Sequence, residues 1–370
     1  MPIHNDPLIA NIQQVLQSGQ QQPILPVGSG TKTGLLLNAS ATLLKMTQHQ
    51  GIVTYDPSEF LITAKAGTAI TEIQDTLKRH GQYLPFDPLF EADGATIGGT
   101  IASGISGPDR LLYGGVRDFV MEVAMIDGLG NLVRDGGKVV KNAAGFDTPK
   151  MMVGSYGRMG ILTEATLKVF PAPQAYAAIQ ISAQNAQHAV ALCHQVLGKP
   201  FPTVGIEIYP DLQVVVRLAA PTASLAGAVE RIEQLLAQPV KALFFDEYAR
   251  YVRQLRDGLQ CNPDDNWNLI RVALAPPSVV LLHEILDRLN VDQWVICGAG
   301  TVAWIKLPTQ CIGDFDEGLR RLKLSAITVR GTNVDFSLGD AGWQQMAGRI
   351  QKAIDPKGRF VPWPLKQRLV

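Results

Sequence analysis

The feature that most restricts the fold of this chain is a concentration of glycine in one segment. Fifteen of the 35 glycines lie between Gly94 and Gly160. Glycine is favoured where φ must be positive or where another group approaches the backbone closely. The same segment contains strand-like stretches rich in β-branched residues, at 119–126, 137–140 and 160–170. We therefore expect a folded wall of backbone built around a ligand, and not a low-complexity coil.

The overall composition narrows the class of protein. The chain has 370 residues, of which 46% are hydrophobic and 18% charged, and its 33 basic residues balance 33 acidic ones. This length suggests about two or three domains. The balanced charge leaves no net positive charge that would favour binding to nucleic acid or an anionic membrane. The first 22 residues do not form a secretory signal, and no apolar stretch is long enough to span a bilayer. We expect a cytoplasmic protein with a small-molecule site.

The four cysteines, Cys193, Cys261, Cys297 and Cys311, are isolated from one another. None belongs to a C-x-x-C pair, and no histidine accompanies them at zinc spacing, so no metal site is predicted. We expect buried, reduced thiols. An iron–sulfur cluster needs about four closely spaced Cys or Cys/His ligands, and this chain cannot hold one by itself.

The glycine content and the pattern of predicted strands and helices change along the chain. Residues 6–18 are predicted to form a helix, with Asp6 as N-cap and Pro7 in the first turn, and residues 71–80 form another. Residues 52–55 and 60–64 resemble a strand pair. After 171–173 the glycine content falls, and strands alternate with helices to about residue 330. This alternation predicts an antiparallel sheet with helices on one face.

A first glycine loop, Gly28 to Gly34, follows a short strand. It is not a Walker loop, because Thr31 precedes Lys32 and Pro26 occupies the position of the earlier glycine. It is not a Rossmann turn either, because residues 48–50 offer no acidic side chain for a ribose. Backbone N–H groups and hydroxyls in such a loop suit a diphosphate, with charge added by Lys32. Taken alone, the loop is better explained as an ordinary tight turn.

The loop belongs to the first of six motifs that occur in order along the chain: Pro26–Thr31, Ala66–Thr68, Leu84–Pro88, Thr96–Ser103, Arg110–Gly114 and Gly157–Ile161. Together they resemble the vanillyl-alcohol-oxidase type of FAD-binding domain. The stretches 137–147, 267–277, 304–306 and 355–360 are similar to the glycolate oxidase group, in particular its smaller, E-type flavin subunit. The resemblance implies an α+β fold: a two-subdomain FAD-binding domain in 1–173, an α+β cap domain with an antiparallel sheet in 174–330, and a C-terminal segment, 331–370, returning to the FAD domain.

The resemblance also implies which residues bind FAD. Those expected at the pyrophosphate are Pro26, Val27, Gly28, Ser29, Gly30, Thr31 and Lys32; those along the diphosphate, ribityl chain and flavin edge are Asp87, Pro88, Gly94, Thr96, Gly98, Gly99, Ala102 and Ser103; Arg110, Tyr113 and Gly114 continue that wall, and Gly160 and Ile161 meet the adenine end. Members of this family that bond FAD covalently use a histidine in or near the first loop or the second glycine run. Neither stretch contains one, so we expect non-covalent FAD.

Catalytic groups are harder to assign. Flavin oxidation of a 2-hydroxy acid needs a base, a cation for the carboxylate, and a donor for the reduced flavin. None of the six histidines lies in a glycine motif, and the histidine-containing Gly-Asp-Gly-Asn type motif of the family's large subunit is absent. The catalytic candidates are Lys141 and Arg271; Lys138 is better explained as a solvated residue. Arg271 stands in an apolar strand, so its partner is a substrate or else an Asp or Glu.

One other basic cluster has a simpler explanation. Arg250, Arg253 and Arg256, with Tyr248 and Tyr251, share one predicted helix and are interpreted as a charged, exposed face.

Two hypotheses remain open. In the first, the chain is the FAD-binding subunit of a glycolate (2-hydroxy acid) dehydrogenase or oxidase, and electrons pass from the flavin to a partner iron–sulfur subunit. In the second, it is a non-catalytic, flavin-bearing accessory or scaffold subunit of such a complex. Both imply a second flavin subunit and an iron–sulfur subunit as partners, and attachment to a membrane only through partners. The exact substrate, the electron acceptor and the proton-abstracting residue are left open.

Overall fold

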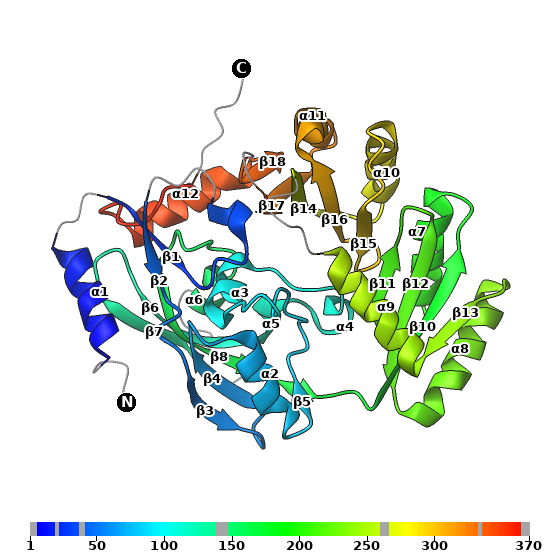
Figure 1. Cartoon of the computed structure of the whole chain (residues 1–370), viewed down its shortest axis with the longest axis horizontal. Coiled ribbons are helices and arrows are strands. Elements are labelled where there is room, and N and C mark those ends of the chain that lie inside the picture. Colours follow the sequence, from blue (N-terminus) through cyan, green and yellow to red (C-terminus); the bar gives the residue numbers. More distant parts are fainter. Residues whose placement is uncertain are drawn as a thin grey trace.

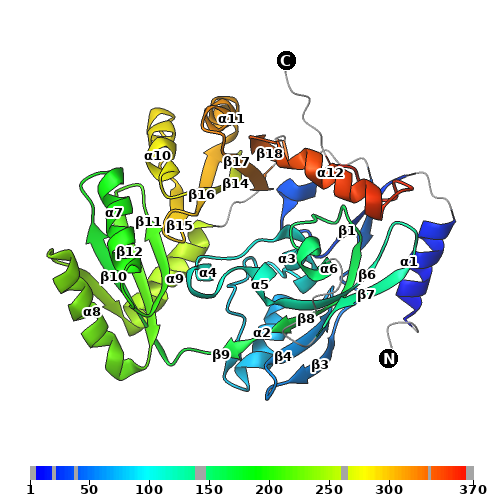
Figure 2. The same cartoon turned by 180° about the vertical axis from the view of Figure 1, so that it is seen from behind.

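The structure, a computed structural model, describes residues 6–18, 22–36, 41–137, 147–259, 266–331 and 335–363. Two sheets dominate it and lie side by side (Figures 1 and 2). The first has five antiparallel strands in the order β3 (Ile52–Asp56), β4 (Leu61–Lys65), β8 (Ile161–Lys168), β6 (Val120–Ile126) and β7 (Leu132–Gly136). The predicted strand at 137–140 lies mostly outside the described residues.

The five-stranded sheet is buried on both faces, because successive side chains along its central strands point into two different cores. Along β6, Val123 and Met125 belong to the core beneath α2 (Ile70–Lys78) and α3 (Ile97–Ser103). The intervening Ala124 and Ile126 pack with α1 (Pro7–Gln17). Short helices α5 (Val116–Phe119) and α6 (Thr148–Met152), and strands β5 (Gln82–Tyr83) and β9 (Phe170–Pro171), complete this half. Helix α1 has the predicted cap, since the Asp6 carboxylate accepts from the Leu8 N–H at 3.0 Å.

The second sheet has nine strands and is antiparallel, as predicted. Their order is β13 (Lys241–Phe244), β10 (Ala175–Ser182), β12 (Gln213–Ala220), β11 (Thr203–Ile208), β15 (Trp294–Cys297), β16 (Val302–Pro308), β14 (Trp267–Ala273), β17 (Ser325–Arg330) and β18 (Ser337–Gly339). One face carries α7 (Ala186–Leu197), α8 (Thr222–Leu236), α10 (Ser278–Arg288) and α11 (Ile312–Arg321), preceded by the 3₁₀ turn η3 (Thr309–Cys311).

The opposite face of this sheet turns toward the first half of the chain. Helix α9 (Phe245–Gly258) lies on this face, where Tyr251 and Leu255 join the same core as Val215 of β12. The prediction that all helices cover one face is therefore wrong for α9. Short helix α4 (Arg110–Tyr113) packs beside β11 and closes the contact between the two halves.

Three arginines of the cap form ion pairs with acidic residues of the first half, and we call these ion pairs the clamp. Arg217 pairs with Asp109, Arg256 with Asp87 and Glu91, and Arg330 with Asp93. The interpretation of Arg256 as a member of an exposed charged face is wrong, because the segment 87–93 folds against it. Tyr251, also assigned to that face, is buried and donates to Glu207 at 3.0 Å.

Arg217 is the most deeply buried member of the clamp. It is 1% exposed, and it donates to both carboxylate oxygens of the fully buried Glu207, from Nε at 3.1 and 3.0 Å and from Nη2 at 2.8 Å. Burial raises the pKa of Glu207, and the Tyr251 hydroxyl opposes this by donating to the carboxylate. A buried carboxylate is tolerated only when an opposite charge and hydrogen-bond donors satisfy it.

The end of the described chain returns to the first half. After α12 (Trp343–Ile354), Phe360 is buried with α1 and bridges Ile24 of β1 (Ile24–Val27), which pairs in parallel with β2 (Thr42–Lys45). Arg158 lies against the rings of Phe336 and Trp363 and donates to the Pro362 carbonyl at 2.8 Å. The boundaries at 173 and 330 stay predictions; β10 begins at 175, and β18 extends the cap sheet beyond 330.

We expect Arg217→Met to lower the free energy of unfolding by about 3–5 kcal/mol, because Glu207 is left buried without its cation. The double variant Arg217→Met/Glu207→Gln is expected to recover a large part of that loss. Urea unfolding followed by fluorescence measures both. Arg253→Met, which removes an exposed arginine of α9, serves as the control and is expected to stay within about 0.5 kcal/mol of the parent. Equal stability of Arg217→Met and this control would contradict the role given to the clamp.

Candidate functional site

A groove follows the first glycine loop and the start of α3. Two adjoining cavities form it and share Pro26, Val27, Gly28, Thr96, Gly99, Ala102 and Gly157. The predicted residues Ser29, Gly30, Thr31, Lys32 and Ser103 line one cavity, and Gly98 and Gly160 line the other. The structure therefore gathers most of the predicted residues into one concavity, although they come from separate parts of the sequence.

Two glycines of the groove are required by close packing. A Cβ on Gly28 would overlap the hydroxyl of Thr96, which caps α3 by accepting from the Gly99 N–H at 3.3 Å. A Cβ on Gly98 would stand 2.8 Å from the carbonyl oxygen of Ala66. The loop is thus held directly on the N-terminus of α3, whose first N–H groups already have partners: Ile97 donates to the Thr68 carbonyl at 2.9 Å and Gly98 to the Ala66 carbonyl at 2.8 Å. The glycine loop itself is the part of this cradle whose backbone N–H groups suit an anionic group such as a phosphate.

Lys32 is a buried cation at this cradle. Lys32 is 8% exposed, and its Nζ lies 5.4 Å from the centre of the Phe90 ring. Its Nζ donates a long hydrogen bond of 3.4 Å to the Thr31 hydroxyl, and among the described residues no carboxylate pairs with it. Burial, and then the nearby Arg330, lower the pKa of Lys32 to about 8. An ammonium placed this way lacks an anion.

Several predicted residues lie outside the groove. The Asp87 carboxylate forms an ion pair with Arg256 and accepts a hydrogen bond from the Asp109 N–H at 3.2 Å, so its partners are protein groups. Pro88 is buried. Gly94 contributes its carbonyl, which accepts from the Ser29 hydroxyl at 2.7 Å. Tyr113 packs edge-on against Phe170, Gly114 ends α4, and Ile161 belongs to the core under α1.

Arg271 lies on β14 and is partly exposed. It does not line the groove itself, but it interacts electrostatically with Arg110 and with Tyr156, which does line the groove. Its Nε has no hydrogen-bond partner, and no described carboxylate forms an ion pair with it. Burial lowers the pKa of Arg271; Tyr156 raises it and Arg110 lowers it further. Of the two partners expected for this guanidinium, an Asp or Glu is thus not found among the residues that the structure describes.

Other candidates can be placed only in part. Lys141 and Lys138 lie outside the described residues. The described histidines are away from the groove: His49 is within 3.0 Å of Asp6, His80 packs on Tyr55 and His283 on Trp294, while His188 and His194 belong to α7. Cys193 and Cys297 are buried, Cys311 is partly buried, and Cys261 is outside the described residues.

Sequence reasoning missed Tyr156 and the contribution of Ser155 and Leu162 to the groove. Tyr156 adopts a positive φ of 50°, which is rare for an aromatic residue and marks a constrained turn. The glycines on either side, Gly154 and Gly157, were the available signal for that turn.

Comparison with known proteins identifies the family. Residues 9–136 match the model of the FAD binding domain. Over 364 residues the chain is 31% identical to the glycolate oxidase subunit GlcE of Escherichia coli (strain K12), and the match covers 95% of each chain. The chain belongs to the GlcE family. It is an FAD-binding oxidoreductase family, and the predicted resemblance is confirmed.

More distant relatives of this GlcE-family chain match part of its length. It is 30% identical over 224 residues to the glycolate oxidase subunit GlcD of Bacillus subtilis (strain 168), covering 59% of this chain and 47% of that one. It is 30% identical over 177 residues to a D-lactate dehydrogenase of Anaerostipes hadrus, covering 47% and 36%. A solved structure of an alkyldihydroxyacetonephosphate synthase superposes with a TM-score of 0.67 at 15% identity, covering 96% of this chain and 74% of that one, and confirms the predicted fold.

Two kinds of feature are absent from the described residues. No described helix of this GlcE-family chain combines the length and apolarity that crossing a bilayer requires. Within the same residues, no group of three or more His, Cys, Asp or Glu side chains gathers as metal ligands do.

Lys32 gives a stability test of the groove. Its pKa of about 8 in the folded protein lies below the ordinary 10.5, so the charged form destabilises the folded state without FAD. We expect Lys32→Met to stabilise the FAD-free protein by up to about 3 kcal/mol at pH 7. The advantage should shrink as pH rises from 8 to 10.5, because the native lysine then loses its proton. Urea unfolding at several pH values measures it, and a pH-independent difference would contradict the assignment.

Proposed function

We propose that this chain is the FAD-binding subunit of a 2-hydroxy-acid dehydrogenase with glycolate as substrate. The observation that carries the proposal is a pair of cations with no carboxylate partner among the described residues: the buried Lys32, which lines the glycine groove, and the partly exposed Arg271, which interacts with Tyr156 of the groove. A dinucleotide's diphosphate and a substrate carboxylate are the two anions such a site requires. The family relationship supports the proposal, since the relatives include subunits named for glycolate oxidase and D-lactate dehydrogenases.

In the proposed site, the loop Pro26–Lys32 holds the diphosphate through its backbone N–H groups. Lys32 adds a full positive charge, and Gly28 and Gly98 allow the loop, Thr96 and Ala66 to pack closely enough to form the cradle. The absence of histidine from both glycine runs supports non-covalent binding. When bound, FAD supplies the acceptor for the hydride of the substrate α-carbon.

Arg271 is proposed to orient the substrate through its carboxylate. A guanidinium binds a carboxylate with two parallel N–H donors, which fixes the direction of the α-carbon as well as its position. Tyr156, which interacts electrostatically with this group, lines the groove, and both residues are only partly exposed to solvent. Arg110, on the wall formed by α4, adds positive charge there.

A second candidate function is favoured by one observation: none of the described histidines is at the groove to accept the hydroxyl proton. The chain would then carry FAD as an accessory subunit, while oxidation takes place on another flavin subunit. In either case we propose that electrons leave through a partner iron–sulfur subunit, since the isolated cysteines here cannot hold a cluster.

Anaerobic titration of the purified, FAD-loaded chain with glycolate separates the two candidates. Bleaching of the flavin absorbance by the chain alone supports the catalytic function. Bleaching only after the partner subunits are added supports the accessory function. A chain that binds no FAD would contradict both.

FAD affinity is expected to fall as pH rises from 7 to 9.5. Below about pH 8 the lysine is already charged, whereas above it FAD binding must take up a proton to charge Lys32. Lys32→Met is expected to weaken FAD binding at pH 7 by about tenfold to a hundredfold and to flatten this dependence. Flavin fluorescence quenching measures the affinity, with Lys241→Met as the control for loss of an exposed lysine. Parallel pH profiles of the two variants would argue against Lys32 at the diphosphate.

Arg271→Met is expected to weaken binding of the 2-hydroxy acid by about tenfold to a hundredfold, because one charge-assisted contact is lost. FAD affinity should be unchanged, and Arg271→Lys should recover part of the loss. The substrate-dependent shift of the flavin spectrum gives the affinity, and KM against kcat gives the kinetic effect if the chain turns over. Arg253→Met is the matched control. Loss of FAD in place of substrate affinity would move Arg271 out of the substrate site.

A further inference from the structure

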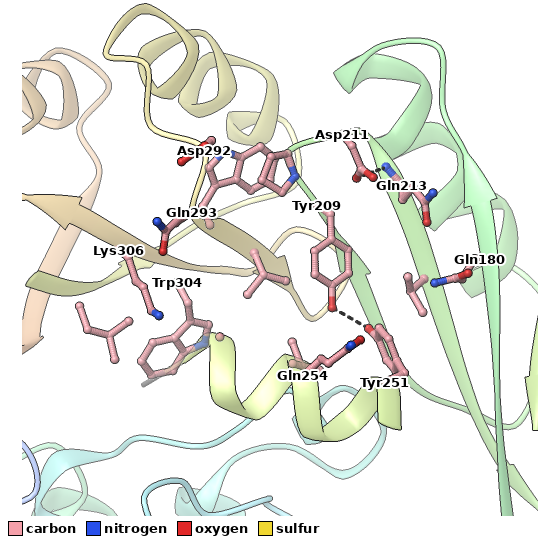
Figure 3. A pocket seen from close by; sticks show the side chains of 17 residues that line it. Gln180, Tyr209, Asp211, Gln213, Tyr251, Gln254, Asp292, Gln293, Trp304 and Lys306 are labelled. Carbon is pink, nitrogen blue, oxygen red and sulfur yellow. Dashed lines mark hydrogen bonds between the residues drawn. The ribbon is translucent and has the colours of Figure 1, made fainter. Parts of the chain in front are cut away.

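We propose that the cap domain carries a second small-molecule site, built for an aromatic carboxylate that also carries a hydroxyl group. The site is a cavity of about 520 Å³ on the face of the nine-stranded sheet that α9 covers (Figure 3). Cavities of about 300–1,000 Å³ hold small organic ligands. The residues lining it are all different from those lining the glycine groove.

The walls of the cavity suit a flat, apolar body. Trp294, Trp304 and Tyr209 supply aromatic surfaces, and Leu269 and Val295 supply aliphatic ones. Aromatic side chains stack on planar ligands and contribute much of the energy of such sites. We therefore expect a ring in the ligand.

Two donors stand together on one wall. The Trp304 indole Nε1 is buried without a hydrogen-bond partner in a residue that is 1% exposed, and an indole nitrogen can only donate. Lys306 follows two residues later on β16, so it shares the face of Trp304, and no described carboxylate forms an ion pair with it. An unpaired, buried N–H beside an ammonium is costly unless an anion accepts from both. A carboxylate satisfies both groups.

Two acidic residues, Asp211 and Asp292, also border the cavity. Both are exposed, and the Asp211 carboxylate accepts from the Gln213 N–H at 3.2 Å. They therefore mark the solvent-facing mouth, while the two donors lie on the sheet.

An acceptor faces the donors from the other side. Tyr251 donates its proton to Glu207 at 3.0 Å, so the 2.9 Å contact between the two tyrosine hydroxyls is a donation from Tyr209 to Tyr251. The Tyr209 oxygen then keeps its lone pairs for the cavity. Figure 3 shows Trp304 and Lys306 on one side of the cavity and the tyrosine pair on the other. A ligand with a carboxylate at one end and a hydroxyl at the other meets both.

This site is distinct from the proposed substrate position. Arg271 is the cross-strand partner of Trp304 but does not line the cavity. A carboxylate bound by Trp304 and Lys306 leaves the Arg271 guanidinium without an anion. The two sites therefore take separate ligands.

The test uses 4-hydroxyphenylacetate, which has both groups and is not a 2-hydroxy acid, so it cannot be oxidised as one. Calorimetric titration of the FAD-loaded full-length chain is expected to show saturable binding of one molecule. Phenylacetate, without the hydroxyl, and 4-hydroxyphenylacetamide, without the charge, should each bind about tenfold or more weakly. Absence of saturable binding, or equal affinity for all three compounds, would overturn the proposal.

Variants assign the contacts. Lys306→Met and Trp304→Phe should each weaken 4-hydroxyphenylacetate binding by about tenfold, and Lys241→Met should leave it unchanged. Tyr209→Phe should abolish the preference for 4-hydroxyphenylacetate over phenylacetate, a readout that a general loss of stability does not reproduce. Arg271→Met should bind the probe as the parent does. A loss of probe binding in Arg271→Met, with Lys306→Met unaffected, would place the probe in the substrate position and overturn a separate site.

Discussion

The arrangement of the two halves depends on a buried arginine that is shared between them. Arg217 projects from the cap sheet, forks onto Glu207 of the neighbouring strand and reaches Asp109 of the first half. Neither Arg217 nor Glu207 is tolerable alone in this environment, since each would be a buried, uncompensated charge. The two halves must therefore dock in one register for either charge to be satisfied. Asp109 directly precedes α4, so this docking also sets the position of the wall that bears Arg110.

The other two arginines of the clamp, Arg256 and Arg330, extend the same control along the groove. Arg256 fixes the segment that carries Asp87 and Glu91, and Arg330 pairs with Asp93 while donating to the Thr31 carbonyl at 2.7 Å. The loop that holds Lys32 is thus bonded to the cap as well as to its own sheet. A site at such a junction can be shaped by both halves, which is where small-molecule sites commonly occur.

Local patterns were sufficient to predict the elements and the glycine cradle. Asp6 and Pro7 defined the start of α1, and the alternation of strands and helices after residue 173 gave an antiparallel sheet. Motif order predicted that Gly28 and Gly98 lie at one groove, and both positions have close neighbours there, the Thr96 side chain at Gly28 and Ala66 at Gly98. Long-range pairing could not be predicted in the same way. The partners of Arg256 and Tyr251 come from segments about 160 and 40 residues away along the chain, and their helix alone looked like an exposed charged face. The same limit applies to the cavity beneath α9, whose lining comes from five strands and a helix that no local motif connects.

The return of the chain end to β1 has a consequence for when the site can form during synthesis. The Ile24 N–H donates to the Arg359 carbonyl at 2.8 Å, and the Val361 N–H returns to the Ile24 carbonyl at 3.3 Å. Strand β1 leads directly into the glycine loop and lies between β2 and residues 359–361, so its second neighbour is available only after residue 361 has been synthesised. Contacts of such sequence separation are slow to form, because the intervening chain must be ordered first. The glycine loop is therefore expected to reach its final position late in folding.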